Sequence, residues 1–275
     1  MNREYDDRVS ASVEYVKSKI RIQPKVGVIL GSGLGDFANL LADKLILNTH
    51  DIPQYPVSSV QGHAGKIIFG TIKSGSRTSA QLIVFQGRIH FYECNDAKTV
   101  VYPIEVAHRL GIKTMIVTNA AGGVNKRFAP GDLMFINDYM NLSFENPLFG
   151  AASDEIRSCR PEFSRNLLAK AKSVALENRI PFKEGVYCWT KGPSYESAAE
   201  IRMMGAAGVD AVGMSTVPEM IAGSSHGIEV LGISCITNFA TGLTSERLAH
   251  AEVTEVANKV KHNFTELVSK IVLRL

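Results

Sequence analysis

Several apolar, strand-like segments of this chain run directly into short polar or glycine-rich turns, and those turns hold most of the residues suited to chemistry. The pairs of segment and turn are 26–30 before 31–35, 82–85 before 86–90, 115–118 before 119–123, 209–212 before 213–216, and 230–236 before 237–238. In open α/β sheets, ligands bind at the carboxyl ends of the strands. The repeated pattern therefore predicts one pocket that binds an anion and a polar small molecule.

Arg88 and His90 stand two positions apart, directly after the apolar segment 82–85. Residues two apart on an extended backbone face the same side, so both side chains are predicted to reach one pocket. A guanidinium suits phosphate because it can donate two parallel hydrogen bonds. His63 lies in the glycine-flanked run 62–65. A lone histidine is more often a satisfied polar side chain than a ligand, but two histidines and an arginine in such turns favour an anion site.

The glycine-rich turn at 31–35 has two readings. A dinucleotide-binding loop requires the pattern G-x-G-x-x-G. Gly31 and Gly33 fit this pattern, but Asp36 stands where the third glycine should be, and its carboxylate would repel a pyrophosphate. There is also no lysine for a nucleoside-triphosphate loop. What remains is a small-anion turn containing the Ser32 hydroxyl, or simply a tight connection between a strand and a helix.

Three further features are ambiguous when taken alone. The run 215–219 (STVPE) is typical of a helix start, with hydroxyl caps followed by proline and an acid. A helix start can also bind phosphate. Glu196 is explained equally well as a first-turn acid. Asn238 is explained equally well as a turn residue after a buried strand.

Composition narrows the class of protein. The chain has 275 residues, is 45% hydrophobic and carries a net charge of +3, so a sizeable core is possible and nucleic acid or a membrane surface is not an indicated partner. Its apolar runs are far shorter than the roughly 20 residues of a membrane helix. Residues 1–8 are charged and lack a signal-peptide core. The scattered cysteines predict reduced thiols in a cytoplasmic protein; they are Cys94, Cys159, Cys188 and Cys235.

Apolar periodicity predicts the elements that must hold these turns. An amphipathic helix is predicted around residues 9–20, with further helices near 97–110, 165–178 and 196–206. A long closing helix is predicted from one apolar stripe, made of Val253, Val256, Val260, Phe264, Leu267, Val268 and Ile271. Residues 144–165 lack periodicity and are predicted to be a long loop of functional or interfacial character. Alternating strands and helices indicate one α/β layer architecture.

Taken together, these turns resemble those of the trimeric purine nucleoside phosphorylases. The resemblance covers residues 24–275. Seven motifs carry it in the family's order: 31–35 (GSGLG), 62–65 (GHAG), 86–93 (QGRIHFYE), 118–123 (TNAAGG), 192–196 (GPSYE), 212–219 (VGMSTVPE) and 237–238 (TN). It implies a single α/β domain over residues 1–275, with a mixed sheet partly closed into a barrel and flanked by helices, in a homotrimer.

The resemblance also implies a reaction and roles for named residues. The reaction is reversible phosphorolysis of 6-oxopurine ribo- and deoxyribonucleosides, with phosphate as co-substrate and no metal or organic cofactor. The implied phosphate ligands are Ser32, His63, Arg88, the backbone N–H of Ala120, and Ser215. The implied sugar contacts are Tyr92, Met214, His90 and His250. The implied base contacts are Tyr195, Glu196 and Asn238; the residues implied in catalysis are Asn238, Glu196 and His90.

The chain departs from the family pattern at three positions. Tyr195 stands where the family usually has phenylalanine, and Cys94 stands where it usually has glycine. Arg160 stands where the family often supplies a phenylalanine to the sugar of the neighbouring subunit. Either Phe149 or Phe163 takes over that contact, or the cover of the sugar is more polar.

Three other functions are weighed against this one. A methylthioadenosine phosphorylase calls for an acid near Asn238 and an apolar pocket for the 5′ group, so Asn238, Glu196 and His250 argue against it. A nucleotide-dependent oxidoreductase is disfavoured by the imperfect glycine motif at 31–35. A non-catalytic nucleoside-binding module would not need the arginine, histidine and serine of a phosphate pocket.

Overall fold

The computed structural model describes residues 3–60, 64–150, 164–244 and 250–275, and for 250–259 it describes the backbone alone. Within these ranges, no helix is both long enough and apolar enough to cross a membrane.

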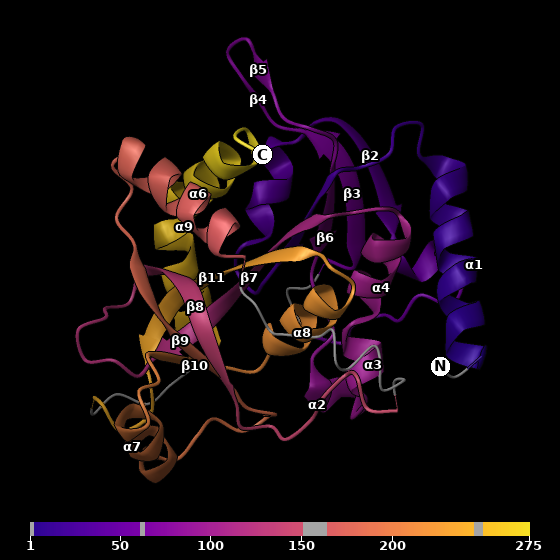
Figure 1. Cartoon of the computed structure of the whole chain (residues 1–275). Coiled ribbons are helices and arrows are strands. Elements are labelled where there is room, and N and C mark those ends of the chain that lie inside the picture. The colour runs from indigo at the N-terminus through magenta and orange to yellow at the C-terminus, as the bar shows by residue number, and fades with distance from the viewer. Residues whose placement is uncertain (1–2, 61–63, 151–163, 245–249) are drawn as a thin grey trace.

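One mixed sheet of nine strands forms the centre of the described part of the chain (Figure 1). Its strands are β1 (Val26–Leu30), β2 (Ala42–Asn48), β3 (Lys66–Thr71), β6 (Leu82–Gln86), β7 (Thr114–Gly123), β8 (Leu133–Asn141), β9 (Lys183–Trp189), β10 (Ala211–Gly213) and β11 (Glu229–Phe239). The order is β10-β9-β8-β11-β7-β1-β6-β3-β2, and β10 pairs with β7 as well. Among the described strands, β7, β11, β8, β9 and β10 therefore close into a barrel, as predicted.

The prediction of turns at 119–123 and 237–238 is wrong, because the strands β7 and β11 continue through these residues. β7 pairs with β1 through its first half, whereas Gly122 and Gly123 at its end pair with β10. The second half of β7 thus takes part in closing the barrel. β11 is irregular between Ile236 and Asn238, and such a bulge re-aims the side chains beside it. The ends of both strands therefore carry polar residues, such as Asn119 and Asn238, while they remain part of the sheet.

Helices cover the sheet in two groups. One group packs with the cluster that contains Val9, Val13, Tyr102 and Val217; it comprises α1 (Arg3–Lys19), α3 (Ala97–Val100), α4 (Tyr102–Arg109) and α8 (Val217–Ser225). The other group, α6 (Arg165–Glu177) and α9 (His250–Val272), packs on the opposite side of β1 and β6 (Figure 1). The other described elements are the helices α2 (Phe91–Cys94) and α7 (Ala198–Ala206), two 3₁₀ helices at Gly35–Leu40 and Thr49–Asp51, and the small hairpin of β4 (Lys73–Ser74) and β5 (Arg77–Thr78).

The predicted helices are confirmed with altered bounds. The predicted closing stripe is buried in α9 at Val260, Phe264, Leu267, Val268 and Ile271. The helix predicted over 97–110 is divided into α3 and α4 at Val101, because Pro103 in the first turn of α4 has no N–H with which to continue the backbone hydrogen bonds of α3. The helix predicted at 196 begins at Ala198, after a capping box formed by Ser197 and Glu200.

The predicted loop is described only in part. Residues 144–150 form no helix or strand. Arg160 and Phe163 lie outside the described residues, whereas Phe149 is described and its side chain is 63% exposed. The strands β2, β3, β8 and β9 were not predicted individually, because their mixed polar and apolar residues give no clean alternation.

Candidate active site

A cavity lies where β1, β6, β7, β10 and β11 end, and it gathers the predicted residues from across the sequence. Its lining includes Ser32, Arg88, His90, Tyr92, Ala120, Tyr195, Glu196, Met214, Ser215 and Asn238. Of the predicted site residues, His63 lies outside the described residues, and for His250 only the helical backbone of α9 is described. The structure thus brings ten residues predicted from six of the motifs to one place.

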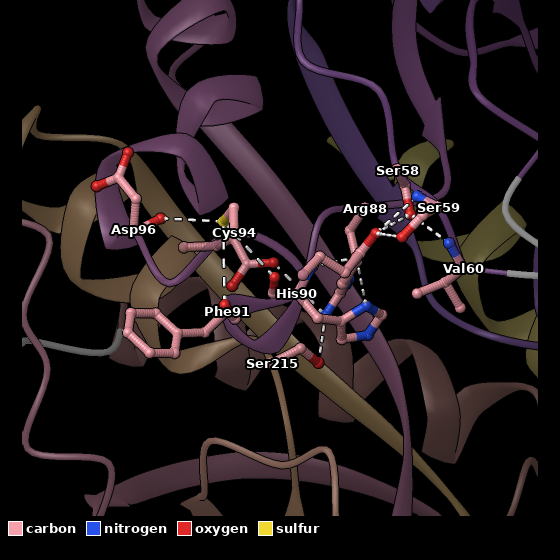
Figure 2. Close-up of polar contacts among 11 residues, drawn as sticks. Ser58, Ser59, Val60, Arg88, His90, Phe91, Cys94, Asp96 and Ser215 are labelled. Atoms are coloured by element: carbon pink, nitrogen blue, oxygen red, sulfur yellow. Dashed lines mark hydrogen bonds and ion pairs between the residues drawn. The ribbon is translucent and has the colours of Figure 1, made fainter.

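Arg88 is held at one end of this cavity by hydrogen bonds from its guanidinium (Figure 2). Its Nη1 donates to Ser215 Oγ at 2.7 Å, and Figure 2 labels both residues. The same Nη1 donates to Thr216 Oγ1 at 3.0 Å, and Nη2 donates to the Thr118 carbonyl at 2.5 Å. The Arg88 side chain is only 2% exposed, so its charge is largely desolvated. Electrostatic interactions with an anion are stronger in such a place than in water.

The predicted helix start after residue 215 is confirmed, but its hydroxyl caps are not. α8 begins at Val217 with proline in the first turn, and the side chain of Thr216 makes no capping hydrogen bond. The Thr216 hydroxyl instead accepts hydrogen bonds from Arg88 and from Asn119 Nδ2, the latter at 2.9 Å. These hydroxyls therefore orient the arginine, while the helix start still presents its positive end to the cavity.

The glycine turn after β1 fits closely against β7. The N–H of Gly31 donates to Thr118 Oγ1 at 3.2 Å. A Cβ at position 31 would lie 2.7 Å from Asn119 Cα, so a larger residue is excluded there. The close approach places Ser32 at the cavity beside Asn119 and Ala120. This supports the small-anion reading of the turn, because backbone and hydroxyl donors meet there.

Glu93 fixes the orientation of His90. Its Oε1 accepts from the His90 N–H at 2.7 Å and lies 3.3 Å from His90 Nδ1, while its Oε2 accepts from the N–H of Ser59 at 2.7 Å and the hydroxyl of Ser58 at 2.9 Å (Figure 2). A carboxylate only accepts, so these contacts favour the tautomer with hydrogen on Nδ1. Burial acts to raise the pKa of Glu93, but the hydrogen bonds from His90, Ser59 and Ser58 together hold it below its usual range.

Aromatic residues lie beside His90 in the cavity. Tyr92 stacks on the His90 ring with 5.0 Å between the centroids. Tyr195 is 44% exposed and lines the same cavity. Met214 approaches Gly192 so closely that a Cβ there would lie 2.4 Å from its sulfur. Flat apolar faces and a flexible thioether thus surround a space next to Glu196.

Glu196 and Asn238 are each fixed by a neighbouring threonine. Thr190 Oγ1 donates to Glu196 Oε1 at 2.6 Å, which occupies one carboxylate oxygen. Thr237 Oγ1 donates to Asn238 Oδ1 at 2.9 Å, and Asn238 Nδ2 donates to the Phe239 carbonyl at 2.9 Å. The Thr237 contact assigns the acceptor end of the Asn238 amide, and one N–H of its NH₂ is left to offer to a ligand.

Several residues of the site were not predicted. Thr190, Thr216, Glu219, Asn119 and Thr237 act on or beside the predicted residues. Thr190 directly follows β9, so recognising that strand would have placed it at a carboxyl end, where sites are expected. The other four lie beside predicted residues in the same motifs, but sequence alone gives no direction for their side chains.

Comparison with known proteins gives one consistent family. A model of the Phosphorylase superfamily matches residues 25–273. Purine nucleoside phosphorylase 1 of Bacillus subtilis (strain 168) is 44% identical over 270 residues, which cover 97% of this chain and 98% of the relative. A solved structure of a Schistosoma purine nucleoside phosphorylase in complex with hypoxanthine has a TM-score of 0.87 and 33% identity, covering 98% of this chain and 97% of the other. A Schistosoma mansoni structure in complex with adenosine has a TM-score of 0.85 and 32% identity, with 98% and 97% covered. The chain therefore belongs to the phosphorylase superfamily and, within it, to the purine nucleoside phosphorylases.

Proposed function

We propose that this phosphorylase acts on 6-oxopurine ribo- and deoxyribonucleosides, and that the cavity described above is its active site. The observation that carries the proposal is that Arg88 and Ser215 share one cavity with Glu196 and Asn238. The first pair suits a phosphate, and the second suits the hydrogen-bonding edge of a purine. Tyr92 lines the same cavity, and a ribose would lie beside it, between the phosphate and the purine.

Phosphate is the nucleophile in this proposal. It would be held by Ser32, His63, Arg88, the backbone N–H of Ala120, and Ser215. One phosphate oxygen attacks C1′ of the sugar while the bond from C1′ to N9 breaks, and the electron pair of that bond leaves with the purine. The transition state has cationic character at the sugar, as in other glycosyl transfers. Because phosphate is already an anion, we propose no metal or organic cofactor, and no activated serine or cysteine.

The sugar would lie against Tyr92 and Met214, close to His90, with His250 toward the 5′-hydroxyl. The stacking of Tyr92 on His90 supports this arrangement, because both side chains line the cavity and hold each other in place. Binding groups that align the reactants lower the barrier by positioning phosphate beneath C1′.

The base would be stabilised by Asn238 and Glu196, beside Tyr195. As the glycosidic bond breaks, negative charge develops on the purine, and the N–H of Asn238 that does not bond the Phe239 carbonyl can donate to N7 or O6. The free oxygen of Glu196 can accept from N1–H. Preorganised polar groups of this kind can each contribute about 3 kcal/mol or more to lowering the barrier. Adenine places an acceptor at N1 and a donor at position 6, so it matches neither group.

The decisive experiment is to incubate the protein with inosine, with and without phosphate, and to follow hypoxanthine release. We expect release only when phosphate or arsenate is present. Equal release without either anion would make the enzyme a hydrolase. The relative values of kcat/KM for inosine and adenosine then test the 6-oxopurine preference; binding of adenosine alone does not, since a related phosphorylase is described in complex with it.

We also propose that the enzyme is a homotrimer whose active sites are completed by a neighbouring subunit. The support is that Phe144 and Phe149, in the loop of 144–150, are 81% and 63% exposed. Exposed aromatic side chains close together favour an interface. Sedimentation at assay concentration should give an oligomer, and a fully active monomer would refute the shared site.

We also propose the extent of the domain and the cellular location of the protein. We take residues 1–275 as one phosphorylase domain, since the family model matches 25–273. We take the location as cytoplasmic, since three of the cysteines, Cys94, Cys188 and Cys235, are free thiols.

A further inference from the structure

Glu219 is a buried carboxylate beside the proposed phosphate site. It lies in the first turn of α8 and is 1% exposed. Within the described residues, neither of its carboxylate oxygens has a hydrogen-bond partner. Its Oε1 lies 3.5 Å from Arg88 Nη1, and the two side chains are 1% and 2% exposed. Burying a charge without hydrogen bonds is unfavourable, so this arrangement calls for an explanation.

Helix capping does not explain this carboxylate. An acid at the third position of a helix often accepts a hydrogen bond from the N–H of the capping residue. Here the helix begins at Val217 after Thr216, and neither oxygen of Glu219 accepts such a bond within the described residues. The charge of Glu219 is therefore directed to Arg88 rather than to its own helix.

The charge of Glu219 matters because three hydrogen-bond acceptors that Arg88 has among the described residues are neutral. They are the hydroxyls of Ser215 and Thr216 and the carbonyl of Thr118. These groups orient the guanidinium without balancing its charge. Glu219 does balance it, on a side chain that is almost wholly withdrawn from water. Removing one partner of a buried ion pair leaves the other charge uncompensated.

We propose that Glu219 is the internal counter-charge of Arg88 and that it weakens the binding of phosphate. The inference rests on the proposed function, in which Arg88 binds phosphate. In the empty enzyme Glu219 stabilises the desolvated guanidinium. When a phosphate dianion arrives, the same carboxylate repels it. By linkage, a group that stabilises the empty state more than the bound state lowers affinity by the same factor. Glu219 thus keeps the site ordered when empty and lets phosphate and the sugar phosphate leave.

The test removes the charge and keeps the shape. We expect Glu219→Gln to bind inorganic phosphate about tenfold more tightly in calorimetry without nucleoside, because one negative charge near a dianion is lost at moderate dielectric constant. KM for phosphate should fall as well, while KM for inosine should stay unchanged. The melting temperature without phosphate should fall, and the rise on adding phosphate should exceed that of the wild type.

Matched variants separate this role from simple packing. Glu219→Asp keeps the charge and should bind phosphate within about twofold of the wild type. Glu105→Gln is the control: Glu105 Oε1 lies 2.8 Å from Nε2 of His226, which follows the last residue of α8, at the end opposite Glu219. This variant should leave phosphate binding unchanged. Glu219→Met is a second neutral variant, with tighter phosphate binding expected again, since apolar replacements of buried ions are often tolerated.

Different results would overturn the inference about Glu219 and the proposed function of the enzyme. Unchanged or weaker phosphate binding in the neutral variants would overturn it, because Glu219 would then be a packing residue or would orient Arg88 for the anion. Failure of both neutral variants to fold in phosphate buffer would also contradict it, since phosphate should replace the missing charge. Phosphate-independent release of hypoxanthine by the wild type would instead overturn the proposed function.

Discussion

Replacing Glu196 by glutamine should turn an acceptor that faces the base into a donor. Thr190 Oγ1 donates to Glu196 Oε1 at 2.6 Å, so this oxygen is already in use. A glutamine of the same shape has only one acceptor oxygen, which the Thr190 hydroxyl should retain. The NH₂ group would then point into the cavity and meet the N1–H of a 6-oxopurine, placing one donor against another.

The magnitude follows from the interactions lost. A hydrogen bond to a charged group contributes about 1.5–3 kcal/mol, and a buried donor left without a partner costs about 1–3 kcal/mol. Glu196 is half-buried, so we take the lower part of the sum, about 2.5–4 kcal/mol. At about 1.36 kcal/mol for each factor of ten, kcat/KM for inosine should fall roughly 70- to 1000-fold. The kcat/KM for adenosine should fall less or should rise, because the N1 of adenine can accept a hydrogen bond from the new NH₂ group.

The assay is the kcat/KM for inosine and adenosine at saturating phosphate. Glu200→Gln is the matched control, because Glu200 makes its hydrogen bonds to Ser197 at the start of α7 and does not line the cavity. Adding Thr190→Val to Glu196→Gln frees the amide to turn and should recover part of the inosine activity. If Glu196→Gln keeps inosine activity within threefold of the wild type, Glu196 does not read N1–H.

Three other predictions follow from the same contacts. Arg88→Ala should raise KM for phosphate and lower kcat/KM at least about a hundredfold, since a charge-assisted bidentate contact is lost; steady-state kinetics with varied phosphate would show this, and an unaltered phosphate KM would remove Arg88 from the site. Asn238→Asp should lower the ratio of inosine to adenosine activity about tenfold or more, because the new carboxylate can accept from a 6-amino group while still accepting from Thr237; an unchanged ratio would mean that Asn238 does not read the base. Glu93→Gln should destabilise the fold at pH 7: the pKa of Glu93 is held below its usual value of 4.5, so its stabilisation is complete above that pH and is lost as the pH falls below it. Urea unfolding should therefore show a gap between wild type and variant at pH 7 that narrows below 4.5, and a constant gap would contradict the assignment.

Local patterns in the sequence were enough to predict many of the residues that line the cavity. Residues at the ends of apolar segments, such as Ser32, Arg88 and Ser215, were predicted from spacing and side-chain chemistry, and the structure places them in one cavity. The long amphipathic helices were predictable for the same reason, since a stripe such as that of α9 is a local property of the chain. Family resemblance added the roles of residues that spacing alone left ambiguous, Glu196 and Asn238 among them.

Closure of the barrel was decided by pairings between distant strands. β10 is three residues long and pairs with both β9 and β7, so no window of sequence contains the information that places it. The same long-range pairing keeps Asn119–Gly123 and Asn238 in strands, although their composition is typical of turns. Strand propensity yields to packing and to pairing of this kind.

The partners of the charged groups were decided only by the tertiary structure. The sequence shows Glu219 as an acid in the first turn of a helix, where a contact with its own backbone is the ordinary expectation. Its position against Arg88, 131 residues earlier in the chain, depends on how α8 packs beside the end of β6. Thr190 reaches Glu196 for a similar reason, through the turn that follows β9. The sequence determines the types of side chain. Their burial away from water and their orientation toward one another, which determine their chemistry, arise only when the strands and helices have packed together.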